Sequence, residues 1–513
     1  MKPRIRNQGH SARRAPVPGV LRPETRTCLD GLRFTPQWLR SLNTSEMQGP
    51  HKPLRFRHIF GRVDAHDTIF DVHPTTSTLE SSFIKVNRKH IAVVWESGFG
   101  SVAVLPREFH GRCNAGLPTV QGNPRPILDI EWNPFNEDLL YTGSEDTNIR
   151  LFQIPEEGLK QNLMTPLLTL SGHTRKVMEL HAHPLAANVL ASVGMENAIR
   201  VWDVDKQQNV YTLDCGHTDS VSSFGWSYDG QRLISACRDK KMRMIDPRAP
   251  EAVQTFDAQS SAKTGKCMWL GRRDWIAAFN FSKTSQRQIL LWDPRHLEAP
   301  FSQTVIDQTG SGMIPYYDED LSCLYFGSRG ETQIRYYELT DDAPFVHYTS
   351  TFAEGGAIRG LAPLHKKYID HMGCEVTKLY KLTQTSVETV SFVAPRRADS
   401  FQEDLYPETN DDVPAMTSAE YFAGAVKPHP TFKITAGALE QALAAERAKN
   451  ATLAARVAEL EAKLAQMMAA PAAAPASPVP AVEGGIPASA PTPAAADAVE
   501  PAASPAEMPQ PSA

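Results

Sequence analysis

The sequence lacks long hydrophobic runs, paired-cysteine motifs and a nucleotide-binding loop, and each absence excludes a class of protein. The longest apolar runs, such as Ile91 to Trp95, are far too short to cross a bilayer. The seven cysteines never form a CxxC pair, which argues against a disulfide framework and a zinc site and favours a reducing cytosol. No GxxxxGK(S/T) loop is present, so phosphate binding of that kind is not expected.

The clusters that could carry chemistry have simpler structural explanations. His181 and His183 could hold a metal, but the sequence suggests no third ligand, so packed or surface histidines are expected. The acids at 318 to 320 are typical of solvated turns between repeats. We therefore predict that the protein is not an enzyme and has no cofactor and no metal site.

What the sequence does contain is a repeat, and its clearest copy runs from residue 172 to residue 203. This segment opens with Gly-His and closes with Trp-Asp, which is the pattern of one blade of a WD-repeat propeller. In such a blade a histidine, a hydroxyl on the second strand and an acid in the next turn form hydrogen bonds that reach the tryptophan indole. The residues in these roles are His173, Ser192, Glu196 and Trp202.

The repeat recurs along the chain. The next copy contains His217, Ser235 and Asp239 and ends at Ile245, where isoleucine replaces the tryptophan. Successive copies end at positions 152, 202, 245, 292 and 337, a spacing of 43 to 50 residues. Residues 53–394 give about 49 residues for each of seven blades. We predict an all-β, seven-bladed propeller over 53–394, with the strand at 53–61 completing the last blade and closing the ring.

The N-terminal 52 residues are expected to form a basic, disordered extension. They carry ten Lys and Arg against three acids, whereas residues 53–513 sum to a net charge of −12. A basic arm can bind nucleic acid or an anionic membrane, and an Arg-rich start can be a transit peptide. The simpler interpretation is that residues 1–46 are an artefact of an upstream start site and that translation starts at Met47. The net negative charge of the remaining residues argues against a nucleic-acid partner.

The chain after the repeats divides into three segments. Residues 395–428 mix aromatic and acidic side chains and are expected to pack on the propeller, with a short helix starting near Thr417. Residues 469–513 are Ala/Pro-rich and are expected to be disordered. Residues 434–468 have heptad spacing and predict a coiled coil, the alternative being a single amphipathic helix docked on the propeller. The oligomerisation positions are Leu443, Asn450, Leu453, Arg456, Val457, Leu460, Glu461 and Leu464.

Several motifs together resemble the coronin family over about residues 53–425. They are RFRHIFG near the start, GSED at 143–146, SACRDKKMRMIDPR at 235–248, LLWDPRHLEAP at 290–300, APFVHYTSTF at 343–352 and FQEDLYP at 401–407. The segment from Arg456 to Glu461 also resembles the trimer-favouring pattern of coronin coiled coils. The resemblance implies an F-actin binder of the cytoplasmic actin cytoskeleton, with the actin-related-protein branching complex and cofilin as further partners. It implies self-association as a trimer, although the Ala-rich flanks also suit a tetramer.

The resemblance also has departures, and one of them affects the expected actin contact. Where coronins commonly carry an arginine important for filament binding, this sequence has His73. We expect basic loop residues to form one actin-binding patch on a single face of the propeller. The competing function is a generic WD-repeat adaptor, such as a substrate receptor of a ubiquitin ligase, but an adaptor has no reason to carry FQEDLYP. The candidate actin-binding residues are His73, Arg88, Lys89, Arg238, Lys240 and Lys241.

Overall fold

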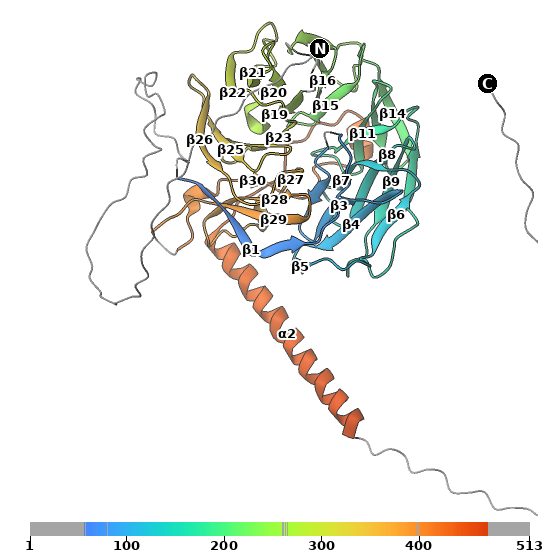
Figure 1. Ribbon diagram of the computed structural model, residues 1–513, viewed down its shortest axis with the longest axis vertical. Helices are drawn as coiled ribbons and strands as arrows, with labels where there is room; N and C mark the ends of the chain where they lie inside the picture. The colour runs from blue at the N-terminus through green and yellow to red at the C-terminus, as the bar shows by residue number, and fades with distance from the viewer. Residues whose placement is uncertain are drawn as a thin grey trace, which may run out of the picture. The chain divides into compact units, whose positions relative to one another are not determined.

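Seven sheets, each with four main antiparallel strands, make up most of the computed structural model (Figure 1). The described residues are 56, 58–79, 81–258, 261, 263, 265–397 and 400–469. The predicted seven-bladed β-propeller is confirmed. The basic extension expected at 1–52 and the Ala/Pro tail beyond residue 469 lie outside the described residues.

Each blade is a short meander whose first strand lies innermost. Blade 1 contains β2 (Ile84–Val86), β3 (His90–Trp95), β4 (Gly100–Pro106) and β6 (Thr119–Asn123). Blade 2 contains β7 (Ile127–Trp132), β8 (Leu139–Ser144), β9 (Asn148–Gln153) and β10 (Leu168–Ser171). Blade 3 contains β11 (Val177–Ala182), β12 (Val189–Gly194), β13 (Ile199–Asp203) and β14 (Gln208–Leu213). Blade 4 contains β15 (Val221–Trp226), β16 (Leu233–Cys237), β17 (Lys241–Ile245) and β18 (Gln254–Asp257). Blade 5 contains β19 (Lys266–Trp269), β20 (Ile276–Phe281), β21 (Arg287–Trp292) and β22 (Ser302–Asp307). Blade 6 contains β23 (Met313–Asp318), β24 (Cys323–Ser328), β25 (Ile334–Leu339) and β26 (Val346–Phe352). Blade 7 contains β27 (Gly360–Pro363), β28 (Glu375–Leu382), β29 (Ser386–Val393) and β1 (Phe60–Phe70).

The ring closes because β1 from the start of the chain pairs with β29 from the end of the repeats. The antiparallel ladder runs from Phe60 opposite Val393 to Phe70 opposite Ser386, and β5 (Gly111–Arg112) adds a short parallel strand outside it. The closure was predicted, but the predicted strand at 53–61 is wrong in its boundaries. Phe56 and Ile59 are buried beside blade 6, where the Tyr336 hydroxyl donates to the Ile59 carbonyl at 2.8 Å. The apolar side chains at 56 and 59 therefore reflect burial against a neighbouring blade.

The propeller core lies between adjacent blades, because a single blade leaves both of its faces apolar. Between blades 2 and 3, for example, Tyr141 and Leu151 pack with Leu180, Leu190 and Trp202 in one buried cluster. The first strands contact one another in cyclic order around the ring, β2 through β27 and back to β2. Stability of each blade therefore depends on its two neighbours.

The alternation of antiparallel strands gives the propeller two distinct faces. We call the face that bears the connections between blades and the turns between second and third strands the connection face. The opposite face bears the turns between first and second strands, and also the C-terminal extension (residues 395–433), so we call it the extension face. A side chain's position within its repeat therefore decides the face on which it lies.

The C-terminal extension crosses the extension face from blade 7 to blade 3. Its short elements are β30 (Thr409–Asn410), α1 (Ser418–Phe422) and β31 (Thr431–Phe432). The carbonyl of Leu185, in the first turn of blade 3, accepts a 2.9 Å hydrogen bond from the amide of Ala415. Met416 and Tyr421 are buried in the core shared by blades 3 and 4. The extension is thus part of the folded domain.

The long helix α2 (Ala436–Ala469) belongs to a second unit that begins at residue 434. The predicted core positions Leu453, Val457 and Leu460 are 62%, 53% and 51% exposed in this single chain. No helix among the described residues is both long enough and apolar enough to cross a membrane.

Candidate functional site

The histidine, serine, acid and tryptophan of blade 3 form one hydrogen-bonded chain. His173 Nδ1 lies 2.6 Å from a Glu196 carboxylate oxygen, and its Nε2 lies 2.6 Å from Ser192 Oγ. Ser192 Oγ also accepts a 2.8 Å hydrogen bond from the Trp202 indole. Burial lowers the pKa of His173 despite the nearby Glu196 carboxylate, and Ser192 is fully buried. A substrate therefore cannot reach this serine, and the group ties strands together.

Blade 4 repeats part of this arrangement without the tryptophan. His217 Nε2 lies 3.0 Å from Ser235 Oγ, and Asp239 forms a 2.6 Å ion pair with Arg243. Burial raises the pKa of Asp239, but hydrogen bonds led by that of Arg243 outweigh it, so the pKa lies well below its usual range. Asp239 remains charged and fixes the turn that presents the basic residues on either side of it.

The six candidate actin-binding residues do not share one face, so the prediction of a single patch is wrong. Arg238, Lys240 and Lys241 lie at the turn between β16 and β17, on the connection face. His73 lies on the same face, in the connection from β1 to β2, with its ring against Trp95 at 5.6 Å between centroids. The pair at 88 and 89 lies in the turn between β2 and β3, on the extension face. Successive turns of an antiparallel meander lie at opposite ends of the blade, which separates the two groups.

The pair on the extension face is already engaged within the chain. Lys89 Nζ lies 3.1 Å from Asp138 Oδ1 and 3.9 Å from Glu137. The Arg88 guanidinium stacks over the ring of Tyr368, 5.4 Å from its centroid. These contacts neutralise or cover the two cations, so they present less free charge to a partner.

The connection face carries three further exposed cations that the sequence reasoning missed, Arg125, Arg175 and Lys283, in addition to the three already predicted at 238, 240 and 241. Among the residues that the structure describes, no ion pair is found for six exposed cations of this face. Their turn positions in the repeat could have signalled them, since each lies in an interblade connection or at a turn between second and third strands. They are Arg125, Arg175, Arg238, Lys240, Lys241 and Lys283, which we call the connection-face cations.

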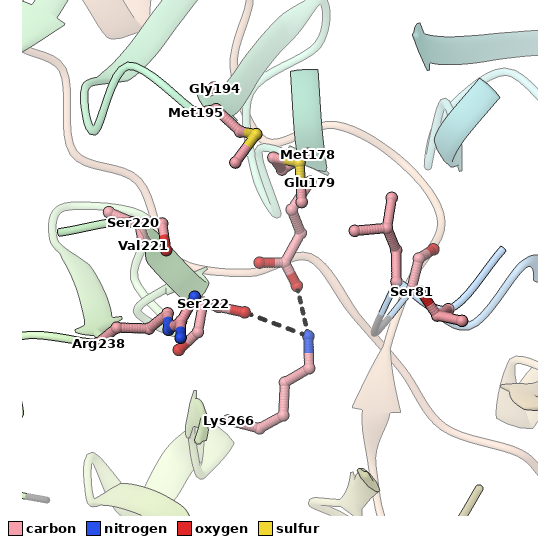
Figure 2. A pocket seen from close by; sticks show the side chains of 12 residues that line it. Ser81, Met178, Glu179, Gly194, Met195, Ser220, Val221, Ser222, Arg238 and Lys266 are labelled. Atoms are coloured by element: carbon pink, nitrogen blue, oxygen red, sulfur yellow. Dashed lines mark hydrogen bonds and ion pairs between the residues drawn. The ribbon is translucent and has the colours of Figure 1, made fainter. Parts of the chain in front are cut away.

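A cavity of about 280 Å³ opens on the connection face beside these cations (Figure 2). Its apolar lining comes from Leu79, Met178, Met195 and Val221, and Arg238 contributes a charged group from blade 4. The lining residues arrive from blades 3, 4 and 5 and from the connection between blades 7 and 1.

Glu179 and Lys266 lie in this cavity as a 3.4 Å ion pair, drawn as a dashed line in Figure 2. Burial raises the pKa of Glu179, but Lys266 and His181 outweigh it and lower the pKa to about 2. The carboxylate is therefore ionised and compensated, and the pair contributes little net charge.

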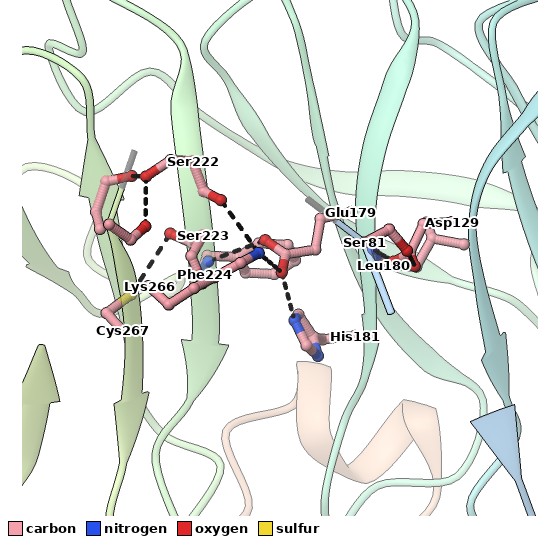
Figure 3. Close-up of polar contacts among 12 residues, drawn as sticks. Ser81, Asp129, Glu179, Leu180, His181, Ser222, Ser223, Phe224, Lys266 and Cys267 are labelled. Atoms are coloured by element: carbon pink, nitrogen blue, oxygen red, sulfur yellow. Dashed lines mark hydrogen bonds and ion pairs between the residues drawn. The ribbon is translucent and has the colours of Figure 1, made fainter. Parts of the chain in front are cut away.

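Below this cavity, polar side chains of the inner strands join several blades (Figure 3). Asp129 accepts a 2.6 Å hydrogen bond from Ser81 and a 2.9 Å hydrogen bond from the Leu180 amide. His181 lies 3.6 Å from Glu179. Among the described residues, no group of three or more His, Cys, Asp or Glu side chains has the geometry to hold a metal ion. These groups link the inner strands of the ring.

His183, which directly follows β11, has a packing role. Its Nδ1 accepts hydrogen bonds from the amides of Leu185 and Ala186 at 3.0 and 2.8 Å, and its Nε2 donates to the Gly230 carbonyl at 3.0 Å. Its ring lies 4.5 Å from that of Tyr421 in the C-terminal extension. Both ring nitrogens are thus committed to the backbone.

Comparison with known proteins gives matches that cover about three quarters of the chain. Family profiles match residues 164–203 and 207–246 as WD domain, G-beta repeat, residues 387–429 as a type of WD40 repeat, and residues 52–112 as a domain of unknown function, DUF1899. Coronin-2A of Bos taurus is 32% identical over 397 residues, which cover 76% of this chain and 75% of the relative. Coronin-A of Dictyostelium discoideum is 34% identical over 394 residues, covering 76% and 88%. The solved WD40 domain of Toxoplasma gondii coronin is 28% identical, with a TM-score of 0.70, and the match covers 74% of this chain and 98% of that domain.

Proposed function

The chain belongs to the coronin family, and from that membership we propose that it binds actin filaments and acts as an oligomeric scaffold regulating actin dynamics. The name of the family relatives supports an actin partner, and the motifs of the C-terminal extension support the same assignment. On this proposal the protein works in the cytoplasm at the actin cytoskeleton, as a binder and not as an enzyme. The actin-related-protein branching complex and cofilin are the further partners that the resemblance implies.

The observation that carries the proposal is the set of connection-face cations. Residues 53–513 carry a net charge of −12, so a set of exposed cations on one face, for which the described residues provide no ion pair, is a local exception. Complementary charge of this kind increases the association rate and selects acidic partners. An acidic filament surface fits this face, whereas the engaged pair on the extension face offers little attraction.

Oligomerisation is proposed to occur through α2. In the single chain Arg456 Nη1 pairs with Glu459 of the same helix at 2.7 Å, and the apolar side chains at 453, 457 and 460 face solvent. Such a stripe is expected to bury itself against other copies, with Arg456 pairing to Glu461 of a neighbour in a trimer. A tetramer is the alternative stoichiometry. Several linked propellers would raise the avidity for a filament that repeats the same site.

The test is cosedimentation with actin filaments at several salt concentrations. Reversing the charges of Arg238, Lys240 and Lys241 to Glu is expected to weaken binding about tenfold or more and to flatten its salt dependence. The matched control reverses Arg88 and Lys89 on the extension face and is expected to bind as the wild type does. Equal binding by the folded connection-face variant would remove this face from the proposal, and absence of wild-type binding would overturn the function itself.

A further inference from the structure

We propose that the cavity on the connection face receives one apolar side chain of an actin subunit, and that Arg238 pairs with a carboxylate beside that side chain. This inference rests on the proposed function and names the part of the face that gives the contact its specificity. It concerns a built recess, whereas the surrounding cations supply general attraction.

The shape and lining of the cavity fit a single inserted side chain. Its volume of about 280 Å³ is at the lower limit of small-molecule pockets, which suits an amino-acid side chain better than a larger ligand. Met178 and Met195 form part of its wall, and the flexible thioethers adapt to the shape of an occupant. An apolar anchor that enters such a recess loses its water on all sides, as the residues that dominate binding energy at interfaces do.

The charges of the cavity specify what should accompany the apolar group. Glu179 and Lys266 compensate each other, so neither attracts a charged partner strongly. Arg238 is exposed, and the described residues include no ion pair with it. A guanidinium presents a planar set of donors that matches a carboxylate, so the expected partner motif is an apolar residue next to Asp or Glu.

The cavity adjoins part of the set of connection-face cations. Arg238 belongs both to its lining and to the charged turn at 238–241, and Arg175 lies in the connection that precedes the strand of Met178. A filament subunit attracted by these cations would therefore have its surface directly over the opening. Electrostatic attraction and insertion of the anchor are then two parts of one contact.

The inference is tested by filling the cavity from two different blades. Met195→Trp fills it from blade 3, and Ser220→Trp fills it from the connection before blade 4. Each change adds bulk at a position that is only partly buried, so each variant should keep its fold, which thermal unfolding and sedimentation would check. Both variants are expected to lose about tenfold in filament affinity by cosedimentation, because the anchor can no longer enter. The matched control is Met372→Trp on the extension face, where the side chain is 54% exposed, and it should bind as the wild type does.

A double variant tests whether Arg238 acts on the same contact. Arg238→Ala alone should weaken filament binding, and its effect should shrink in the Met195→Trp background, because a blocked anchor no longer brings the carboxylate to the guanidinium. Wild-type affinity in both folded Trp variants would overturn the inference while leaving the proposed function intact. Losses that simply multiply would overturn the pairing of Arg238 with the anchor. Absence of wild-type binding would instead overturn the proposed function, and this inference with it.

Discussion

The hydroxyl of Tyr406 donates a 2.8 Å hydrogen bond to the carbonyl of Glu375, joining the C-terminal extension to the first residue of β28. The same hydroxyl lies 3.2 Å from the His371 carbonyl, and the Tyr406 ring is buried and stacked on Phe401. Tyr406 belongs to FQEDLYP, the motif that most clearly separates this chain from a general WD-repeat protein. The motif therefore has a mechanical role, which is to fix the start of the extension to blade 7.

Removing this hydroxyl should destabilise the domain without changing its fold. Tyr406→Phe removes the one hydroxyl proton that is donated to the Glu375 carbonyl, which costs about 1–2 kcal/mol of unfolding free energy. Denaturant unfolding monitored by tryptophan fluorescence would measure the loss. The matched control is Tyr348→Phe, since Tyr348 is 57% exposed and water can replace its contact. Equal stability of both variants would show that the hydrogen bond contributes nothing net.

N-terminal truncation should affect stability in steps that follow the observed closure. Deleting residues 1–46 should leave the unfolding temperature unchanged, because nothing there has the period of a strand. Deleting through Gly61 removes the buried side chains of Phe56 and Ile59, each worth roughly 2 kcal/mol, and only the first two pairs of the ladder. Deleting through Phe70 removes all of β1 and should open the ring. Identical behaviour of the last two variants would mean that closure by the β1–β29 ladder adds nothing.

The repeats were predictable because their signals are local. His173, Ser192 and Trp202 come together within one blade, and their hydrogen bonds depend only on the spacing inside that blade. The face on which a loop residue lies is also encoded by its turn. The prediction that Arg88 and Arg238 share one patch failed because the turn at 87–89 follows a first strand, whereas the turn at 238–240 follows a second strand.

Contacts between distant segments could not be predicted from local pattern. The engagement of Lys89 by Asp138 joins blade 1 to blade 2, and the contact of Tyr406 with Glu375 joins residues 31 positions apart. Both depend on which turns the closed ring brings side by side. The cavity formed by Met178, Met195 and Arg238 is of the same kind, since its walls come from different blades.

The oligomeric state should depend on the apolar stripe of α2. Replacing Leu453 and Leu460 with Gln removes two core layers for each chain, and each buried leucine is worth roughly 2 kcal/mol. Sedimentation velocity should then show a monomer, and circular dichroism should show that the propeller remains folded. An oligomer that persists would place the interface on the propeller.

The trimer pattern can be tested by a smaller change in the same helix. Arg456→Ala removes the proposed pair with Glu461 of a neighbouring chain and should shift the stoichiometry or weaken the trimer. Glu459→Gln is the matched control and should leave the stoichiometry unchanged, because Glu459 pairs only within its own helix, with Arg456 at 2.7 Å and Lys463 at 2.6 Å. An unaltered stoichiometry in Arg456→Ala would mean that Asn450 or the Ala-rich flanks decide it.

The stability of the propeller should fall as the pH falls below about 6.5, and His183 should contribute to that fall. Burial lowers the pKa of His183 to about 4, from its ordinary value of 6.5. The unfolded chain therefore takes up this proton before the folded chain does, so the contribution is present above pH 6.5 and is lost between pH 6.5 and 4. Within that window, uptake of one proton by the unfolded chain lowers the free energy of unfolding by about 1.4 kcal/mol for each pH unit.

The variant that tests this linkage is His183→Asn. Its side-chain oxygen can still accept a hydrogen bond from the Leu185 or Ala186 amide, but it does not titrate. The variant should be less stable at pH 8, because the ring also packs on Tyr421, yet its stability should fall less steeply between pH 6.5 and 4. An unchanged slope in denaturant unfolding would assign the acid sensitivity to other groups. His217 is one such group, since burial also lowers its pKa to about 4.

By its resemblance to coronins, the sequence has His73 at a position where arginine is common. His73 is exposed on the connection face with its ring edge against Trp95, so a longer side chain can extend into solvent without displacing the fold. His73→Arg adds a permanent cation to the face proposed to meet the filament and should tighten binding about two- to fivefold at low salt. Cosedimentation at rising salt should show the gain shrinking, because exposed charges are screened. His73→Gln is the neutral control and should give no gain. Unchanged affinity in His73→Arg would mean that the filament contacts other parts of this face, and weaker affinity would mean that the imidazole itself makes the contact.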